Sequence, residues 1–241
     1  MSPELGSSVT ITEFWVTPEG QQTRLASDFA LRVVEQQTDA VLTDFAKDGF
    51  RGALSREQLH TRLNEILADI TEETQWMAAL RKLRNRLQLR WIWQDANRLT
   101  TLVQLTRELS DFADLCIEAA TAFAEPALEA RYGQPVGEDN GQRQHLIVIA
   151  MGKHGAGELN YSSDMIFCFD EAGDTTGRKS IPVQQYMIQL GQAIIRLLDQ
   201  PTADGFVFRV DMRLRPWGDG SPLAISHNAL ERYLEQHGRD W

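Results

Sequence analysis

A glycine-rich connection between two apolar segments constrains the fold of this chain more than any other feature. The connection, residues 150–164, reads A-M-G-K-H-G-A-G-E-L-N-Y-S-S-D. It follows the apolar residues 146–149 and leads directly into the apolar residues 165–169. Short apolar runs bounded by glycine and polar residues are typical of strands joined by a turn or loop. The segment therefore predicts a strand, a glycine-rich loop and a second strand with a carboxylate at its start.

The loop has the composition of a phosphate-binding site. Its three glycines (Gly152, Gly155 and Gly157) let the backbone come close to a bound group and direct N–H donors at it. Lys153 adds a positive charge, and Asp164 follows at the start of the second strand. An acid repels a phosphate directly, but it fits a site in which a divalent cation lies between the two. The spacing is neither G-x-G-x-x-G nor a Walker loop, so a purely structural connection is an equal alternative on these residues alone.

A downstream strand pattern strengthens the functional interpretation. Residues 205–216 read G-F-V-F-R-V-D-M-R-L-R-P, and from Phe208 to Arg215 apolar and charged side chains alternate. In a strand, this alternation puts Arg209, Asp211 and Arg213 on one face. An acid between two arginines fits a site for a metal ion and the phosphates bound to it. The alternative interpretation is an exposed strand face on which the three charged side chains pair only with one another. Together with the glycine-rich loop, the strand indicates metal-assisted phosphoryl or nucleotidyl transfer.

Three longer sequence motifs align in register with one protein family and carry a resemblance to it. They are M-G-K-x-G-x-G-E-L-N-Y-S-S-D, L-D-Q-P-T-A-D-G-F-V-F-R-V-D-M-R-L-R-P and E-Q-H-G-R-D-W. The chain resembles the nucleotidyltransferase superfamily that includes DNA polymerase beta. More specifically, it is similar to the glutamine synthetase adenylyltransferase/adenylyl-removing family. Its three motifs resemble those of the family's N-terminal, deadenylylating domain. The match is strong over residues 146–241 and extends to the earlier residues only in pattern.

The resemblance implies a fold and an activity. The fold is α+β, with an N-terminal helical region followed by a polymerase-beta-like nucleotidyltransferase domain, a mixed sheet flanked by helices. The activity is Mg²⁺-dependent removal of AMP from a tyrosine of glutamine synthetase, in which phosphate attacks adenylyl-tyrosine and ADP leaves. The implied partners are glutamine synthetase, nucleotide (ADP or ATP) and phosphate, with a PII-type regulator that contacts regions outside this chain.

The same resemblance implies roles for particular residues. Asp164 and Asp211 are expected to be catalytic and to bind Mg²⁺. The residues expected to bind nucleotide or phosphate are Gly152, Lys153, Gly155, Ser163, Arg209 and Arg213.

Two departures from the family pattern bear on activity. The family reads S-S-D-x-D-L-I-F where this chain reads S-S-D-M-I-F from Ser162 to Phe167, so the second acid is absent. Removing two residues preserves which side chains face the core, because the strand period is two. We therefore keep a second hypothesis, a catalytically impaired module that binds nucleotide or glutamine synthetase, and a third, a nucleotidyltransferase for a small molecule or nucleic acid. His154 stands where the family has an apolar residue, and we interpret it as a solvated turn residue.

Composition argues against several other classes. The net charge of -10 opposes binding to nucleic acid, and no apolar run is long enough to span a membrane. The chain does not start with basic residues followed by an apolar stretch, so we expect a cytoplasmic protein, with Cys116 and Cys168 as buried thiols. A basic segment around two tryptophans is interpreted as a solvated helix face with paired charges rather than a nucleic-acid site. Its basic residues are Arg81, Lys82, Arg84, Arg86 and Arg90.

The hydrophobic pattern divides the chain into three parts. Residues 1–132 show helical periodicity with few breakers, including a capping box that begins at Ser55. Residues 133–144 are polar and rich in turn formers, which predicts a linker. Residues 145–241 mix strand and helix patterns, with a helix expected at about 183–198. This last part is the predicted nucleotidyltransferase domain, cut short on its C-terminal side.

Overall fold

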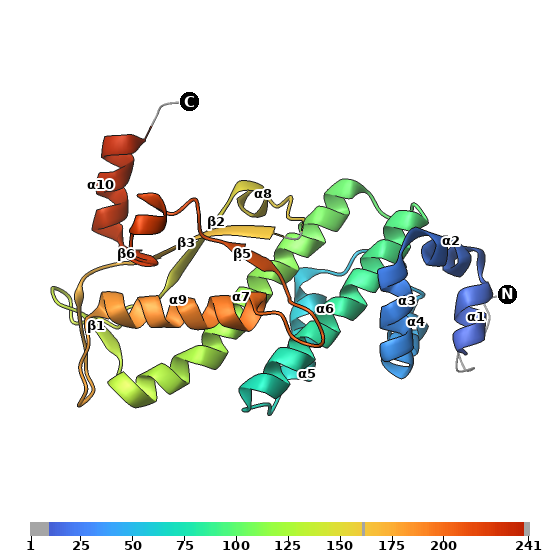
Figure 1. Cartoon of the computed structure of the whole chain (residues 1–241), viewed down its shortest axis with the longest axis horizontal. Helices are drawn as coiled ribbons and strands as arrows, with labels where there is room; N and C mark the ends of the chain where they lie inside the picture. The colour runs from blue at the N-terminus through green and yellow to red at the C-terminus, as the bar shows by residue number, and fades with distance from the viewer. Residues whose placement is uncertain (1–9, 161, 239–241) are drawn as a thin grey trace. The chain divides into compact units, whose positions relative to one another are not determined.

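The computed structural model describes residues 10–160 and 162–238 (Figure 1). The chain divides into two compact units between Glu108 and Leu109, inside the long helix α7 (Leu102–Tyr132). The first unit is helical, and the second combines helices with a mixed sheet, so the predicted α+β fold is confirmed. Within the described ranges, none of the helices has both the length and the apolar character needed to cross a membrane.

Local capping rules set the helix starts of the first unit. Before α7, its described helices are α1 (Ile11–Val16), α2 (Pro18–Ala26), α3 (Asp28–Gln36), α4 (Thr38–Asp48), α5 (Arg56–Leu67) and α6 (Glu73–Ala96). At the start of α5, the Ser55 hydroxyl accepts from the backbone N–H of Gln58 at 3.2 Å, and the Gln58 side chain accepts from the Ser55 N–H at 2.9 Å. The predicted capping box is therefore confirmed, with two otherwise unpaired backbone donors satisfied.

The basic segment lies on α6 and is largely buried, which corrects the interpretation of a solvated face. The side chains of Arg81 and Arg90 are 0% and 2% exposed. Arg90 donates to both carboxylate oxygens of Asp48, at 2.8 and 2.9 Å, and Arg86 donates to Asp44 at 2.9 Å. Since α2, α3 and α5 all pack against α6, its charged side chains also face protein and have to be paired there. Arg86 and Arg90 are thus paired within the fold rather than on a solvated surface, whereas Lys82 is exposed.

The second unit is built around one central strand. Its elements after α7 are β1 (Pro135–Gly137), β2 (Ile147–Met151), α8 (Gly152–Gly155), β3 (Ser162–Phe169), β4 (Gly173–Thr175), α9 (Val183–Asp199), β5 (Arg209–Asp211), η1 (Gly218–Gly220), β6 (Ala224–Ser226) and α10 (His227–His237). β2 runs antiparallel along one edge of β3, while β5 and β6 pair with β3 in parallel. The predicted strand, glycine-rich connection and strand are thus confirmed as β2, α8 and β3, and α9 is the predicted helix.

Burial of β3 explains its continuous apolar sequence. All residues from Met165 to Phe169 are buried. On α9, a Cβ atom at Gly191 would lie 2.6 Å from the ring of Phe167, so glycine permits this helix to pack closely on the strand. Cys116 and Cys168 are both buried and form no disulfide, as predicted.

The segment predicted as a linker belongs to the second unit. Residues 133–144 include β1, which pairs antiparallel with β4. The Glu171 carboxylate also accepts from the backbone N–H groups of Asp139 and Asn140, at 3.2 and 3.1 Å. A three-residue strand bounded by turn formers has the composition of a linker, which is why the sequence pattern does not distinguish the two. The boundary between compact units therefore differs from the predicted one and falls at 108/109.

Candidate functional site

The two predicted catalytic acids lie next to each other in the sheet. β3 and β5 run parallel, and their register pairs Asp164 with Asp211. Residues paired in this way lie about 4.8 Å apart and direct their side chains to the same face. The opposite face is covered by helix α7, because Phe208, just before β5, packs on Phe112 with ring centroids 5.9 Å apart. The register therefore puts both carboxylates on the face of the sheet turned away from α7.

The glycine-rich loop starts directly beside Asp164. Met151, the last residue of β2, is paired with Asp164, and Gly152 follows with φ at 53°. A Cβ atom at Gly152 would lie 3.0 Å from Oδ2 of Asp164, and one at Gly155 would lie 2.5 Å from the carbonyl oxygen of Ala150. Both glycines are thus explained by close approach and, for Gly152, by the left-handed backbone. The loop backbone at Gly152 thus lies directly against the carboxylate of Asp164.

Asp211 is bonded to a neighbouring arginine. Nε of Arg213 donates to Oδ1 and Oδ2 of Asp211 at 3.0 and 2.8 Å, and the backbone N–H of Arg213 donates to Oδ1 at 2.9 Å. These hydrogen bonds, with smaller contributions from the charges of Arg213 and Arg209, hold the pKa of Asp211 below its usual value. Arg213 itself is 81% exposed at its side chain, and Arg209 and Lys153 are exposed as well. Asp211 is therefore a carboxylate kept ionised beside positive charge at the surface.

The donor set suits a partly assembled Mg²⁺ site. Magnesium in phosphoryl-transfer sites is held by one or two carboxylates together with substrate phosphates, and Asp164 and Asp211 supply two carboxylates on one face. Over the described residues, no group of three or more His, Cys, Asp or Glu side chains is arranged to hold a metal ion. The residues thus fit one ion that also has phosphate ligands, provided that the bond from Arg213 to Asp211 opens.

Ser163 and His154 occupy places that the sequence did not reveal. Ser163 alternates with Asp164 along β3, so its side chain points to the face covered by α7, and it is 0% exposed. His154, interpreted as a solvated turn residue, is 4% exposed, and that interpretation is wrong. Its Nδ1 lies 2.6 Å from the Ser163 hydroxyl, and its Nε2 lies 2.8 Å from Oδ1 of Asp114 on α7. Ser163, His154 and Asp114 therefore form a hydrogen-bonded chain beneath the two acids.

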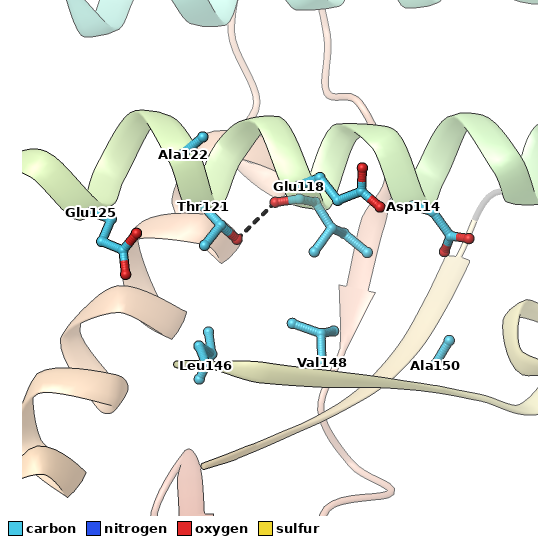
Figure 2. A pocket seen from close by; sticks show the side chains of 9 residues that line it. Asp114, Glu118, Thr121, Ala122, Glu125, Leu146, Val148 and Ala150 are labelled. Atoms are coloured by element: carbon cyan, nitrogen blue, oxygen red, sulfur yellow. Dashed lines mark hydrogen bonds between the residues drawn. The ribbon is translucent and has the colours of Figure 1, made fainter. Parts of the chain in front are cut away.

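A groove lies on the α7 side of the sheet, where the Asp114 end of this chain is found. Figure 2 shows carboxylates from α7 on one wall and apolar side chains from β2 and the residue before it on the other. The groove has a volume of about 560 Å³, and the residues that form these walls include Asp114, Glu118, Glu125, Leu146, Val148 and Ala150. Glu125 is paired with Arg143 at 3.0 Å. The groove and the two predicted catalytic acids are thus on opposite faces of the sheet.

Comparisons with known proteins match almost the whole chain. Residues 23–241 fit the sequence model of the family described as glutamate-ammonia ligase adenylyltransferase. The bifunctional glutamine synthetase adenylyltransferase/adenylyl-removing enzyme of Acinetobacter baylyi is 59% identical over 230 residues, which are 95% of this chain and 25% of that protein. Proteins of the same description are 40% identical in Pseudomonas putida, over 91% of this chain and 23% of theirs, and 48% identical in Chromobacterium violaceum, over 68% and 18%.

The shared region is a part of each relative. The chain spans about a quarter of the length of the Acinetobacter and Pseudomonas proteins. It nevertheless contains both strands that carry the paired acids and the glycine-rich loop beside them. With a family match over residues 23–241, the chain belongs to the glutamate-ammonia ligase adenylyltransferase family of nucleotidyltransferases.

Proposed function

We propose that this chain removes AMP from adenylylated glutamine synthetase by Mg²⁺-dependent phosphorolysis. The observation that supports the proposal is the pairing of Asp164 with Asp211 on one face of the sheet, with the glycine-rich loop against Asp164. Relatives are described as bifunctional enzymes that add and remove adenylyl groups, and the three sequence words resemble the removing domain. In the proposed reaction, the bond between the adenylyl phosphorus and the tyrosine oxygen breaks. Phosphate takes the place of tyrosine, so the products are ADP and the free phenol.

The proposed roles of the side chains follow from their charges and positions. Mg²⁺ bound by Asp164 and Asp211 would neutralise charge on the adenylyl phosphate. Asp164 lies against the loop backbone at Gly152, whereas Asp211 has to exchange Arg213 for the metal. The exposed side chains of Arg213 and Arg209 are proposed to bind the incoming phosphate. The two acids and two arginines thus provide positioning and charge neutralisation, which are the main contributions of a protein to phosphoryl transfer.

The loop residues have separate proposed contributions. Lys153 is exposed and supplies a positive charge, and Gly152 and Gly155 supply backbone N–H groups at close range. Ser163 contributes only through its backbone, because its hydroxyl is bonded to His154 on the opposite face. The proposed contribution of Ser163 to phosphate binding is therefore limited to its backbone N–H group.

The two buried thiols fit a reducing compartment, so we propose the cytoplasm as the location. Glutamine synthetase is the proposed substrate partner. A PII-type regulator is proposed to contact regions of the relatives outside this chain.

A second candidate function is a module that binds nucleotide or glutamine synthetase with little turnover. It is favoured by the side chain that follows Asp164 on the same strand face. That side chain is Ile166, 7% exposed, at the position where the family pattern has a second acid. The bond between Asp211 and Arg213 also favours it, since this bond competes with metal binding.

Turnover of adenylylated glutamine synthetase separates the two functions. The intact chain is incubated with this substrate, phosphate and Mg²⁺, and ADP is measured by chromatography while loss of AMP from the substrate is followed by mass spectrometry. Turnover that requires Mg²⁺ and is lost in Asp164→Asn and Asp211→Asn supports the enzyme. Binding of Mg²⁺ and ADP without turnover supports the second function, and the absence of both contradicts the two proposals.

A further inference from the structure

We propose that His154 is a positioning residue for the nucleotide site, held by Asp114 and acting through Ser163. The proposal rests on the proposed function, because it assumes that Asp164 and the glycine-rich loop form a nucleotide and metal site. It concerns the hydrogen-bonded chain that joins α7, α8 and β3. None of the roles proposed above uses the hydrogen bonds among Asp114, His154 and Ser163.

The direction of the hydrogen bonds follows from the groups involved. An ionised Asp114 carboxylate can only accept, so Nε2 of His154 is the donor in the 2.8 Å contact. In the neutral ring, Nδ1 is then the acceptor, and the Ser163 hydroxyl donates to it at 2.6 Å. Each of the three side chains thus has a defined role as donor or acceptor. The rotation of the Ser163 hydroxyl and the orientation of the imidazole ring are both set by this arrangement.

Ser163 is not placed to act as a nucleophile. The same three groups activate serine in hydrolases, but there the hydroxyl faces the substrate. Here Ser163 is 0% exposed and His154 is 4% exposed, while the Asp114 side chain is 44% exposed. A substrate can reach the Asp114 carboxylate but not the Ser163 hydroxyl. The burial therefore argues for a structural link to the site rather than for acyl or phosphoryl transfer to serine.

The link reaches the proposed site by two adjacent contacts. Ser163 directly precedes Asp164 on β3, so fixing Ser163 on one face fixes the direction of Asp164 on the other. His154 follows Gly152 by two residues, and Gly152 lies against Oδ2 of Asp164. Within the loop, Gly152 thus lies beside the Asp164 carboxylate. His154 is bonded to Ser163 on the opposite face of the sheet. Removing a group that hydrogen-bonds directly to a metal ligand commonly changes metal affinity or activity by about 10-fold to 100-fold. His154 acts on Asp164 through the backbone of Ser163, so we expect an effect at the lower end of this range.

Binding of Mg²⁺ with ADP provides a readout besides activity. Isothermal titration calorimetry on the intact chain is carried out for His154→Ala, Ser163→Ala and the double variant. We expect each single variant to weaken binding by about 10-fold. If His154 acts through Ser163, the double variant should be no weaker than the single variants, because the two residues belong to one interaction. His145→Ala is the matched control, since His145 is exposed just before β2, and its affinity should equal that of the unaltered chain.

Conservative variants distinguish positioning from a general loss of folding. His154→Asn retains a polar group near Ser163 and should recover part of the affinity lost in His154→Ala. Asp114→Ala removes a half-exposed carboxylate that bonds to His154, so it should leave the fold intact and weaken binding less than His154→Ala. Thermal unfolding of every variant shows whether the protein is folded in the binding experiment. If His154→Ala is unfolded, the comparison between Asp114→Ala and the unaltered chain decides.

The outcomes separate this inference from the proposed activity. Unchanged affinity in folded His154→Ala or Asp114→Ala, or losses that add in the double variant, would overturn the positioning role. Binding of Mg²⁺ and ADP by the unaltered chain without phosphorolysis would overturn only the proposed activity. Absence of binding by the unaltered chain would overturn both.

Discussion

Replacing Gly152 with alanine tests whether the glycine-rich loop positions Asp164. Gly152 has φ at 53°, and a left-handed backbone costs an L-residue about 1–2 kcal/mol. The added Cβ would also lie 3.0 Å from Oδ2 of Asp164, so the carboxylate has to shift by a few tenths of an ångström. Gly141 is the matched control, because its φ is 65° and a Cβ there would meet no atom within 4 Å. Only Gly152→Ala combines backbone strain with displacement of the acid.

Two measurements separate strain from displacement. In urea unfolding, both variants should lose about 1–2 kcal/mol of unfolding free energy. In calorimetry with Mg²⁺ and ADP, Gly152→Ala should bind about 10-fold more weakly, which corresponds to about 1.4 kcal/mol, while Gly141→Ala should bind normally. Equal affinities in the two variants, at equal losses of stability, would refute the argument that the loop backbone holds Asp164 in its binding position.

Three further predictions concern acids in and outside the site. Inserting Asp-Leu between Met165 and Ile166 preserves the strand alternation and should raise the rate of Mg²⁺-dependent phosphorolysis by about 10²–10³; an unchanged rate would show that the second acid is dispensable. The lowered pKa of Asp211 means that its bond to Arg213 stabilises the fold above the unfolded pKa and is lost as pH falls through the folded pKa. In Arg213→Ala, carboxyl NMR titration should show the pKa of Asp211 rising toward its ordinary value, and no rise would mean that the pair does not form in solution. Burial raises the pKa of Glu108, so its contribution to stability falls as pH rises from the unfolded pKa through the folded one. Urea unfolding at several pH values should show Glu108→Gln gaining stability relative to the unaltered chain over this range, and a constant difference would contradict it.

Local sequence patterns were sufficient to predict which strand face each candidate residue occupies and where the loop backbone comes close to a neighbour. Alternation along 205–216 predicted that Phe208 and Asp211 face opposite ways, and Phe208 does pack on α7 while Asp211 is paired with Asp164 on the other face. The glycines of the loop allow close backbone approach, which Gly152 makes to Asp164, while the predicted approach to a bound phosphate stays a prediction. These features follow from strand period and backbone freedom, which are properties of neighbouring residues in the chain.

The identity of each side chain's partner was decided by tertiary structure. His154 looked like a solvated loop residue because nothing near it in sequence indicates a partner, yet Asp114, forty residues earlier, and Ser163 enclose it. The arginines of α6 looked like a polar helix face, but other helices cover that face, so Arg90 has to pair with Asp48. Periodicity reports which side of an element a residue occupies, whereas burial and pairing depend on what packs against that side, and in this chain distant segments supply it.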